Sequence, residues 1–231
     1  MSLVSQSRYF FFRLKKFLKR RYHKVRGFLA GFTFPYDIAS LKKSPVVALP
    51  HPVDWKRVMP YEELVAEIGS GHGEFLDSFK SKDSIVVGFE IKSRYYKLSY
   101  LKTRGLKNVF LYKVSGYEAI DLLFSDESLS RVVVLFPDPW HKERHHKRRP
   151  LTAKWFRRVC KKLKPGGQII IASDWQEYVD FIREEFTNVT AIYDVEEGVY
   201  TPEKFGFPVT HYHQKWIRKK RKFTYFQAIK K

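Results

Sequence analysis

The chain has 231 residues, of which 44% are hydrophobic and 17% aromatic, enough to build a core and to exclude wholesale disorder. Lys and Arg number 44 against 24 Asp and Glu, so the formal charge of +20 favours a polyanionic partner over a small neutral substrate alone. The single cysteine, Cys160, excludes a disulfide within the chain and a cysteine zinc cluster.

The N-terminal segment is strongly basic. Residues 1–31 contain nine Lys and Arg residues and no acid. Apolar side chains at near-helical spacing predict a basic amphipathic helix that packs its apolar stripe on the body and binds RNA phosphates; a helix on a membrane surface is the alternative. Prolines and glycines then predict a linker, so residues 1–52 form an extension and 53–231 one domain. No membrane span or signal peptide is evident, so a cytoplasmic protein without membrane contact is expected.

From residue 64 onwards, short β-branched runs alternate with amphipathic stretches. This alternation predicts an α/β fold, a Rossmann-like doubly wound, mostly parallel sheet with helices on both faces. Pro165, Gly166 and Gly167 are expected to end a helix. Strands are predicted at 64–68, 84–91, 108–112, 131–136 and 168–173, and helices at 73–80, 92–104, 116–124, 151–163 and 175–186.

A glycine loop follows the first predicted strand. Gly69 and Gly71 allow the backbone to turn sharply and to approach a ligand closely, as in nucleotide sites. Glu67 and Glu74 flank the loop and suit a cationic or amino-bearing ligand better than an anion. Glu90 ends the second strand, where a carboxylate can accept hydrogen bonds from ribose hydroxyls. The pattern resembles an S-adenosylmethionine site; an NAD site or a simple tight turn are the alternatives.

The fourth predicted strand runs into the segment FPDPWHKERHHKRR, residues 136–149. The prolines beside Asp138 stiffen the backbone and hold its carboxylate at the strand end. This segment closely resembles the hallmark of the bacterial tRNA (guanine-N7)-methyltransferase family, and the resemblance extends over most of 53–229. It implies a seven-stranded fold, S-adenosylmethionine as methyl donor, and N7 of guanine 46 in the tRNA variable loop as acceptor.

The resemblance also implies a role for particular residues. Asp138 corresponds to the catalytic carboxylate beside the cofactor. The cofactor-binding residues it implies are Glu67, Gly69, Gly71, Glu90, Ser115 and Asp138. The substrate-binding residues it implies are Lys142, Asp174, Thr210 and His213.

Two of these positions depart from the family pattern. Ser115 stands where the family usually has a cofactor-binding Asp, and His213 where it has a Glu that contacts the guanine. A carboxylate can accept from guanine N1–H and N2–H, whereas a histidine offers one acceptor at most.

Residues 142–164 and 215–231 have an excess of Lys and Arg over Asp and Glu, as residues 1–31 do, while the rest of the chain is mildly acidic. These three basic segments are expected to form a binding surface for an RNA backbone. Histidines in the second segment lie among Lys and Arg, so no metal is expected.

The other readings of the function are a methyltransferase of the same fold acting on another RNA nucleotide, an amino methyltransferase, and a tRNA-binding relative without turnover. A monomer or a homodimer is expected.

Overall fold

The computed structural model describes residues 38–43, 46, 49, 51–80 and 83–231. The predicted N-terminal helix lies outside these residues. Within them, no helix is long and apolar enough to cross a membrane.

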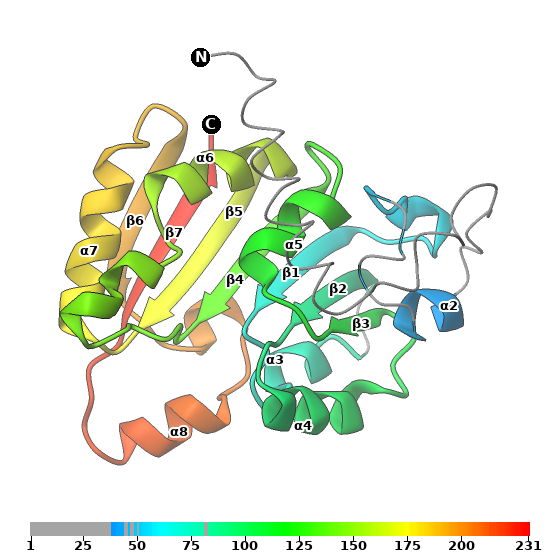
Figure 1. The fold of residues 1–231 in the computed structure, drawn as a ribbon, viewed down its shortest axis with the longest axis horizontal. Helices are drawn as coiled ribbons and strands as arrows, with labels where there is room; N and C mark the ends of the chain where they lie inside the picture. Colours follow the sequence, from blue (N-terminus) through cyan, green and yellow to red (C-terminus); the bar gives the residue numbers. More distant parts are fainter. Residues whose placement is uncertain (1–37, 44–45, 47–48, 50, 81–82) are drawn as a thin grey trace. The chain divides into compact units, whose positions relative to one another are not determined.

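A seven-stranded sheet forms the centre of the described chain (Figure 1), in the order β3-β2-β1-β4-β5-β7-β6. The first five strands are parallel, and β7 is antiparallel to both of its neighbours, β5 and β6. The strands are β1 (Glu63–Ile68), β2 (Ser84–Phe89), β3 (Val109–Tyr112), β4 (Leu129–Leu135), β5 (Leu163–Ser173), β6 (Tyr193–Val199) and β7 (Thr224–Lys230).

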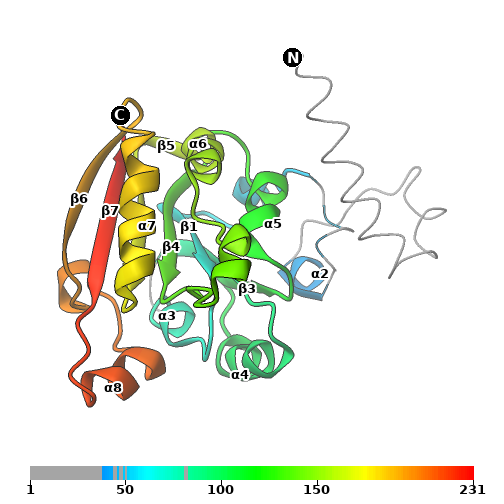
Figure 2. The same cartoon turned by 60° about the vertical axis from the view of Figure 1, so that its left-hand side comes forward.

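Helices connect the parallel strands and cover both faces of the sheet (Figure 2). Phe75 and Leu76 of α3 pack in the core cluster with Val133, on one face. Phe186 of α7 contacts Phe226 on the other face. The α-helices are α2 (Ile38–Lys43), α3 (Glu74–Asp77), α4 (Ser93–Thr103), α5 (Gly116–Leu123), α6 (Ala153–Lys162), α7 (Gln176–Thr187) and α8 (His211–Ile217), and the 3-10 helices are η2 (Trp55–Arg57), η3 (Glu143–Arg148) and η4 (Glu203–Phe205).

The predicted fold class is confirmed, since the five strands read from the sequence are β1 to β5. Their apolar runs are buried on both faces, as in β2, where every residue is buried. Helix α6 ends at Lys162, close to its predicted end, but the predicted start of the next strand at residue 168 was wrong. Residues 165–167 lie inside β5, where Leu163 and Gln168 pair with Leu129 and Arg131 across a bulge.

The C-terminal hairpin of β6 and β7 was not located by the strand pattern. β6 is the edge strand and most of its side chains are exposed, so its sequence lacks an apolar run. β7 lies within the basic segment 215–231, and its carboxy-terminal Lys230 pairs with Glu127 at 3.1 Å. This part of the third basic segment therefore forms structure and is not a free surface for RNA.

Candidate functional site

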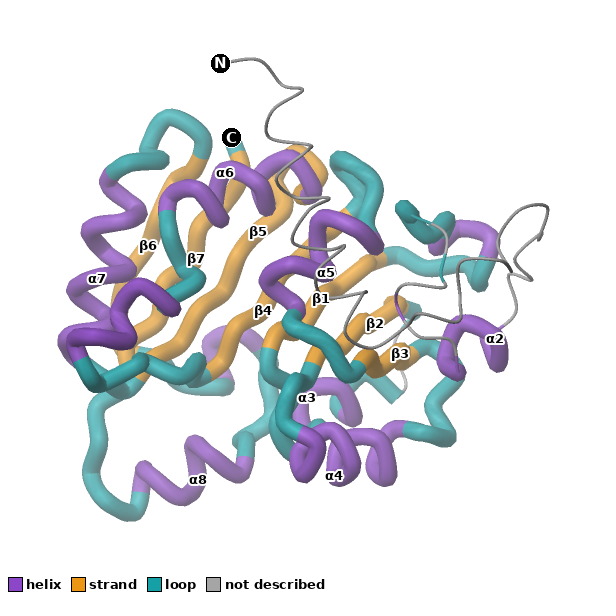
Figure 3. Tube along the Cα trace, in the orientation of Figure 1, coloured by secondary structure: helices purple, strands orange, loops and turns teal. Residues whose placement is uncertain are grey.

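The predicted site residues gather at the carboxyl ends of the parallel strands. Because these strands share a direction, the loops that follow them meet at one edge of the sheet (Figure 3). Gly69 directly follows β1, Glu90 follows β2, and Asp174 follows β5. Ser115 and Asp138 lie three residues beyond β3 and β4. Residues from five segments of the chain thus lie at the same edge of the sheet.

The loop after β1 is open on its outer side. Gly69 and Gly71 have φ of 86° and 53°, and a Cβ added at Gly69 would meet nothing within 4 Å. The Glu90 carboxylate holds this loop: Oε2 accepts from the Gly71 N–H at 3.0 Å, and Oε1 accepts from the Lys92 N–H at 2.7 Å. Each carboxylate oxygen has a second lone pair, so Glu90 can still accept from a ligand hydroxyl.

A buried carboxylate without a partner lies behind the loop. Glu67 is 3% exposed, and its Oε2 has no hydrogen-bond partner in the protein. Burial raises the pKa of Glu67 to about 8, and the nearby carboxylates of Glu74 and Glu90 add to this, while a hydrogen bond from Ser70 opposes it. A carboxylate in this state gains most from a cationic or hydrogen-bond-donating ligand.

Glu67 should make stability depend on pH in the cofactor-free protein. The folded chain keeps this group protonated up to about pH 8, whereas the unfolded chain releases the proton near the ordinary glutamate pKa of about 4.5. The folded state binds more protons in this window, so stability falls as pH rises through it. From this group alone, the free energy of unfolding of the wild type should fall by about 3 kcal/mol between pH 5 and pH 8. Denaturant unfolding of Glu67→Gln at the two pH values should show that this fall is absent.

The matched control is Glu62→Gln, which removes a carboxylate from an exposed position just before β1. It should keep the wild-type dependence on pH. Equal slopes for Glu67→Gln and wild type would contradict the role given to the buried carboxyl group.

Gly73 closes the loop and begins α3 with a φ of 82°. A Cβ there would lie 2.6 Å from Ser99 Oγ and 2.9 Å from Ser99 Cα, against α4. Gly73→Ala should therefore lower the free energy of unfolding by about 2 kcal/mol, from backbone strain and overpacking together.

The control Gly206→Ala separates backbone strain from overpacking, because Gly206 has a φ of 63° and open space around it. It should cost about 1 kcal/mol in the same denaturant titration, and equal costs would rule out the clash.

The loop after β4 is held in an unusual backbone conformation. Phe136 and Trp140, at the two ends of the segment 136–140, have φ of 53° and 52°. Non-glycine residues rarely adopt this region, and such strain is found where a side chain must be positioned. Between them, Asp138 is exposed, and its Oδ1 accepts from the Trp140 N–H at 3.0 Å. The loop therefore presents one carboxylate to solvent in a fixed orientation.

Arg149 anchors the far end of this segment. Its side chain is 4% exposed; Nε donates to the Pro139 carbonyl at 3.0 Å and Nη2 to Glu177 at 2.8 Å. The guanidinium lies over the rings of Tyr178 and Phe181 at 5.2 and 5.3 Å. This last basic residue of the motif is thus committed to the fold, whereas Lys142, at the start of η3, is exposed.

Asp174 is embedded in a network with α8 and the segment after it. Tyr212 donates its hydroxyl to both oxygens of Asp174, each at 3.1 Å, and Arg221 forms an ion pair with the same carboxylate. The Tyr212 ring stacks on Phe136 with centroids 5.0 Å apart. This network joins the ends of β4 and β5 to α8. Nothing in the sequence pattern singled out Tyr212 or Arg221, because both lie far from Asp174 along the chain.

His213 does not face the crevice as an exposed acceptor. It is 4% exposed and packs among Phe136, Tyr200 and Phe223, with ring centroids 5.9, 5.5 and 4.6 Å away. Burial lowers its pKa, and its Nδ1 has no partner. Thr210 caps α8 by accepting from the His213 N–H at 3.2 Å. Ser115 precedes α5 without a side-chain capping bond, which leaves its hydroxyl for a ligand.

No group of three or more His, Cys, Asp or Glu side chains arranged to hold a metal ion occurs in the described part of the chain.

Comparison with known proteins places this geometry in a family context. A family model with the description "Putative methyltransferase" matches residues 61–226. A tRNA (guanine-N(7)-)-methyltransferase of Marinobacter nauticus is 34% identical over 157 residues, which are 66% of this chain and 66% of that protein. One of Pseudomonas putida is 30% identical over 215 residues, covering 89% of this chain and 86% of that protein.

Among solved structures, the 16S rRNA methyltransferase KamB superposes with a TM-score of 0.52. The superposition covers 74% of this chain and 89% of that one, at 14% sequence identity. At this identity, the likeness establishes the shared fold.

Proposed function

The chain belongs to the tRNA (guanine-N7)-methyltransferase family, whose members are S-adenosylmethionine-dependent enzymes, and from this premise we propose its reaction and its site. It transfers the methyl group of S-adenosylmethionine to N7 of guanine 46 in the variable loop of tRNA. The relatives support the substrate and the cofactor, while the nucleotide and the residue roles are our assignment.

The residues present fit this cofactor. The buried Glu67 carboxyl group, whose Oε2 has no partner, suits the amino group of the cofactor, and the Glu90 carboxylate suits its ribose hydroxyls. Gly69 leaves open space beside them. Ser115 can donate or accept one hydrogen bond where the family has a carboxylate. When bound, the cofactor supplies a methyl group on a positively charged sulfur.

The protein's task is positioning. Guanine N7 carries an in-plane lone pair that is unprotonated at neutral pH, so no general base is required. N7 would attack the methyl carbon directly while the bond from that carbon to sulfur breaks, with S-adenosylhomocysteine as the leaving group. The residues must bring nucleophile and methyl into line. Asp138, exposed at the end of β4, accepts from the amino edge of the guanine and favours the positive charge that the ring gains. Lys142 and Thr210 engage the tRNA, and Asp174 acts at the same edge through its contact with Tyr212.

The observation that carries this proposal is the fixed Asp138 carboxylate after β4, at the same edge of the sheet as the open glycine loop and the buried Glu67, whose Oε2 has no partner. The test is methyl transfer from radiolabelled S-adenosylmethionine to an unmodified tRNA transcript, beside a transcript in which guanine 46 is adenine. Label on the first alone is expected. Label on both would move the target to another nucleotide. Bound cofactor with label on neither would indicate a tRNA-binding relative without turnover.

A different target nucleotide is the second candidate, and the burial of His213 is the observation that favours it. A family position that carries a guanine-contacting Glu holds a side chain enclosed by aromatic rings in this chain. The two transcripts above separate the candidates directly. The protein is further proposed to work in the cytoplasm, as a monomer or homodimer, without membrane contact.

A further inference from the structure

Helix α8 has an outer face that carries donors and no acid. His211, Gln214, Lys215 and Arg218 line a cavity of about 290 Å³. Their spacing of three, four and seven residues places them on one face of the helix, and all four are exposed. Lys, Arg and the Gln amide are donors, which is the set that a phosphate group requires.

The charges on this face are uncompensated. Among the described residues, Lys215 and Arg218 have no ion-pair partner, although Lys215 lies over the ring of Trp216 at 4.9 Å. Some other cations of the described chain do have acidic partners, such as Arg183 with Glu197 at 2.7 Å and Arg158 with Asp121 at 3.0 Å. No acid therefore competes with an external anion for these two cations in the cavity lining.

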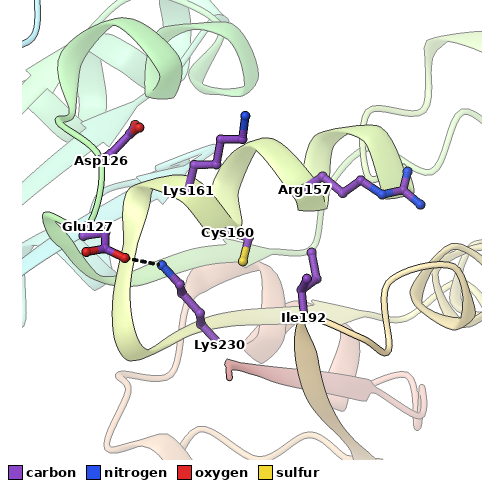
Figure 4. A pocket seen from close by; sticks show the side chains of 7 residues that line it. All are labelled: Asp126, Glu127, Arg157, Cys160, Lys161, Ile192 and Lys230. Atoms are coloured by element: carbon purple, nitrogen blue, oxygen red, sulfur yellow. Dashed lines mark hydrogen bonds and ion pairs between the residues drawn. The ribbon is translucent and has the colours of Figure 1, made fainter.

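A second cavity differs from the α8 cavity because acidic as well as basic side chains line it (Figure 4). It has about 590 Å³ and lies where α6 ends and β5 begins, away from the carboxyl ends of the parallel strands. Here Lys230 donates to Glu127 at 3.1 Å, and Asp126 pairs with Lys162 at 2.7 Å. The lining of this cavity includes the carboxylates of Asp126 and Glu127, whereas the lining of the α8 cavity includes no carboxylate.

The position of the α8 cavity relates it to the reaction. His211 stacks on His72 of the glycine loop, with ring centroids 4.4 Å apart and planes inclined by 15°. Tyr212, the next residue, stacks on Phe136 and bonds Asp174. Helix α8 thus contacts both the glycine loop after β1 and the loop after β4. An anion in the cavity would lie beside the place where the nucleotide must be presented.

We infer that His211, Gln214, Lys215 and Arg218 form a subsite for a backbone phosphate of the RNA, close to the nucleotide that receives the methyl group. This inference rests on the proposed function for the identity of the RNA. A phosphate clamp here would hold the strand while the base is drawn from its stack, since extrusion rotates the nucleotide about its backbone. The cofactor's own carboxylate is the other anion that could reach the cavity, and the test separates the two.

The experiment uses the full chain, an unmodified tRNA transcript and S-adenosylhomocysteine as cofactor probe. The variant Lys215→Gln/Arg218→Gln is compared with Lys161→Gln/Lys164→Gln, which removes two exposed lysines around the start of β5. The dissociation constant for tRNA should rise about tenfold in the first variant. The slope of its logarithm against the logarithm of salt concentration should fall by about one to two. The control should stay close to wild type.

Affinity for S-adenosylhomocysteine should change less than about twofold in both variants, since a phosphate contact acts on RNA engagement. Equal tRNA affinity and salt slope in the two variants would overturn the inference. A loss of S-adenosylhomocysteine affinity in the first variant would also overturn it and assign the cavity to the cofactor. A wild-type protein that binds tRNA but transfers no methyl group would refute the proposed function while leaving this binding test intact.

Discussion

Asp138→Asn is expected to lower kcat for methyl transfer by about two to three orders of magnitude, which is the usual effect of removing one group that stabilises charge at the reacting centre. The asparagine keeps the shape of the side chain, and its oxygen can still accept from the Trp140 N–H. The loop between the two strained residues therefore keeps its conformation, and what changes is the negative charge beside the ring that becomes positive.

Single-turnover methylation with saturating tRNA and cofactor measures this step, and separate binding titrations should show affinities for tRNA and S-adenosylhomocysteine within about threefold of wild type. Asp126→Asn is the control: this exposed carboxylate pairs with Lys162 and lines the cavity at the start of β5. An Asp138→Asn protein with near wild-type turnover would remove this carboxylate from the mechanism.

Arg149→Met is expected to lower the free energy of unfolding by about 3 kcal/mol, from two hydrogen bonds with a charged donor and the loss of buried packing. The guanidinium joins the Pro139 carbonyl to Glu177 of α7 while lying over two aromatic rings. Removing it frees the far end of the loop that carries Asp138. Turnover measured below the unfolding transition should fall as well, because the carboxylate is no longer held in place.

Lys147→Met is the matched control, since it removes a cation two residues earlier from an exposed position in the same motif. It should leave stability within about 0.5 kcal/mol of wild type and raise KM for tRNA. Denaturant unfolding and steady-state kinetics of both variants test the distinction. If the two lost equal stability, Arg149 would be one more surface cation and not an anchor.

Most of the site could be predicted from the sequence because its residues follow strands that the apolar pattern locates. The apolar strand pattern places Glu67 near the end of β1, Glu90 directly after β2 and Asp138 shortly after β4. Parallel strands bring their carboxyl ends together at one edge of the sheet. Ser115 was found through the family resemblance and lies at the same edge.

What could not be predicted are contacts between segments far apart in the chain. The pairing of Asp174 with Tyr212 and Arg221 joins residues 38 and 47 positions apart, and no local pattern encodes it. Net charge was also an incomplete guide. Arg149 and Lys230 belong to basic segments that suggested an RNA surface, yet one is buried against Glu177 and the other pairs with Glu127. Charge counts do not distinguish a cation in an ion pair from one that faces solvent.

The order of the strands has a consequence for synthesis. β7 is made after β5 and β6, yet it lies between them and is the only described strand that links β6 to the sheet. Until residues 224–230 have left the ribosome, the edge of β5 has no neighbour, and its apolar run 169–172 has unpaired backbone groups along one side. Unpaired edges of this kind recruit other chains. A nascent or truncated chain that stops before β7 is therefore expected to need a chaperone, although it already contains every residue assigned to the cofactor.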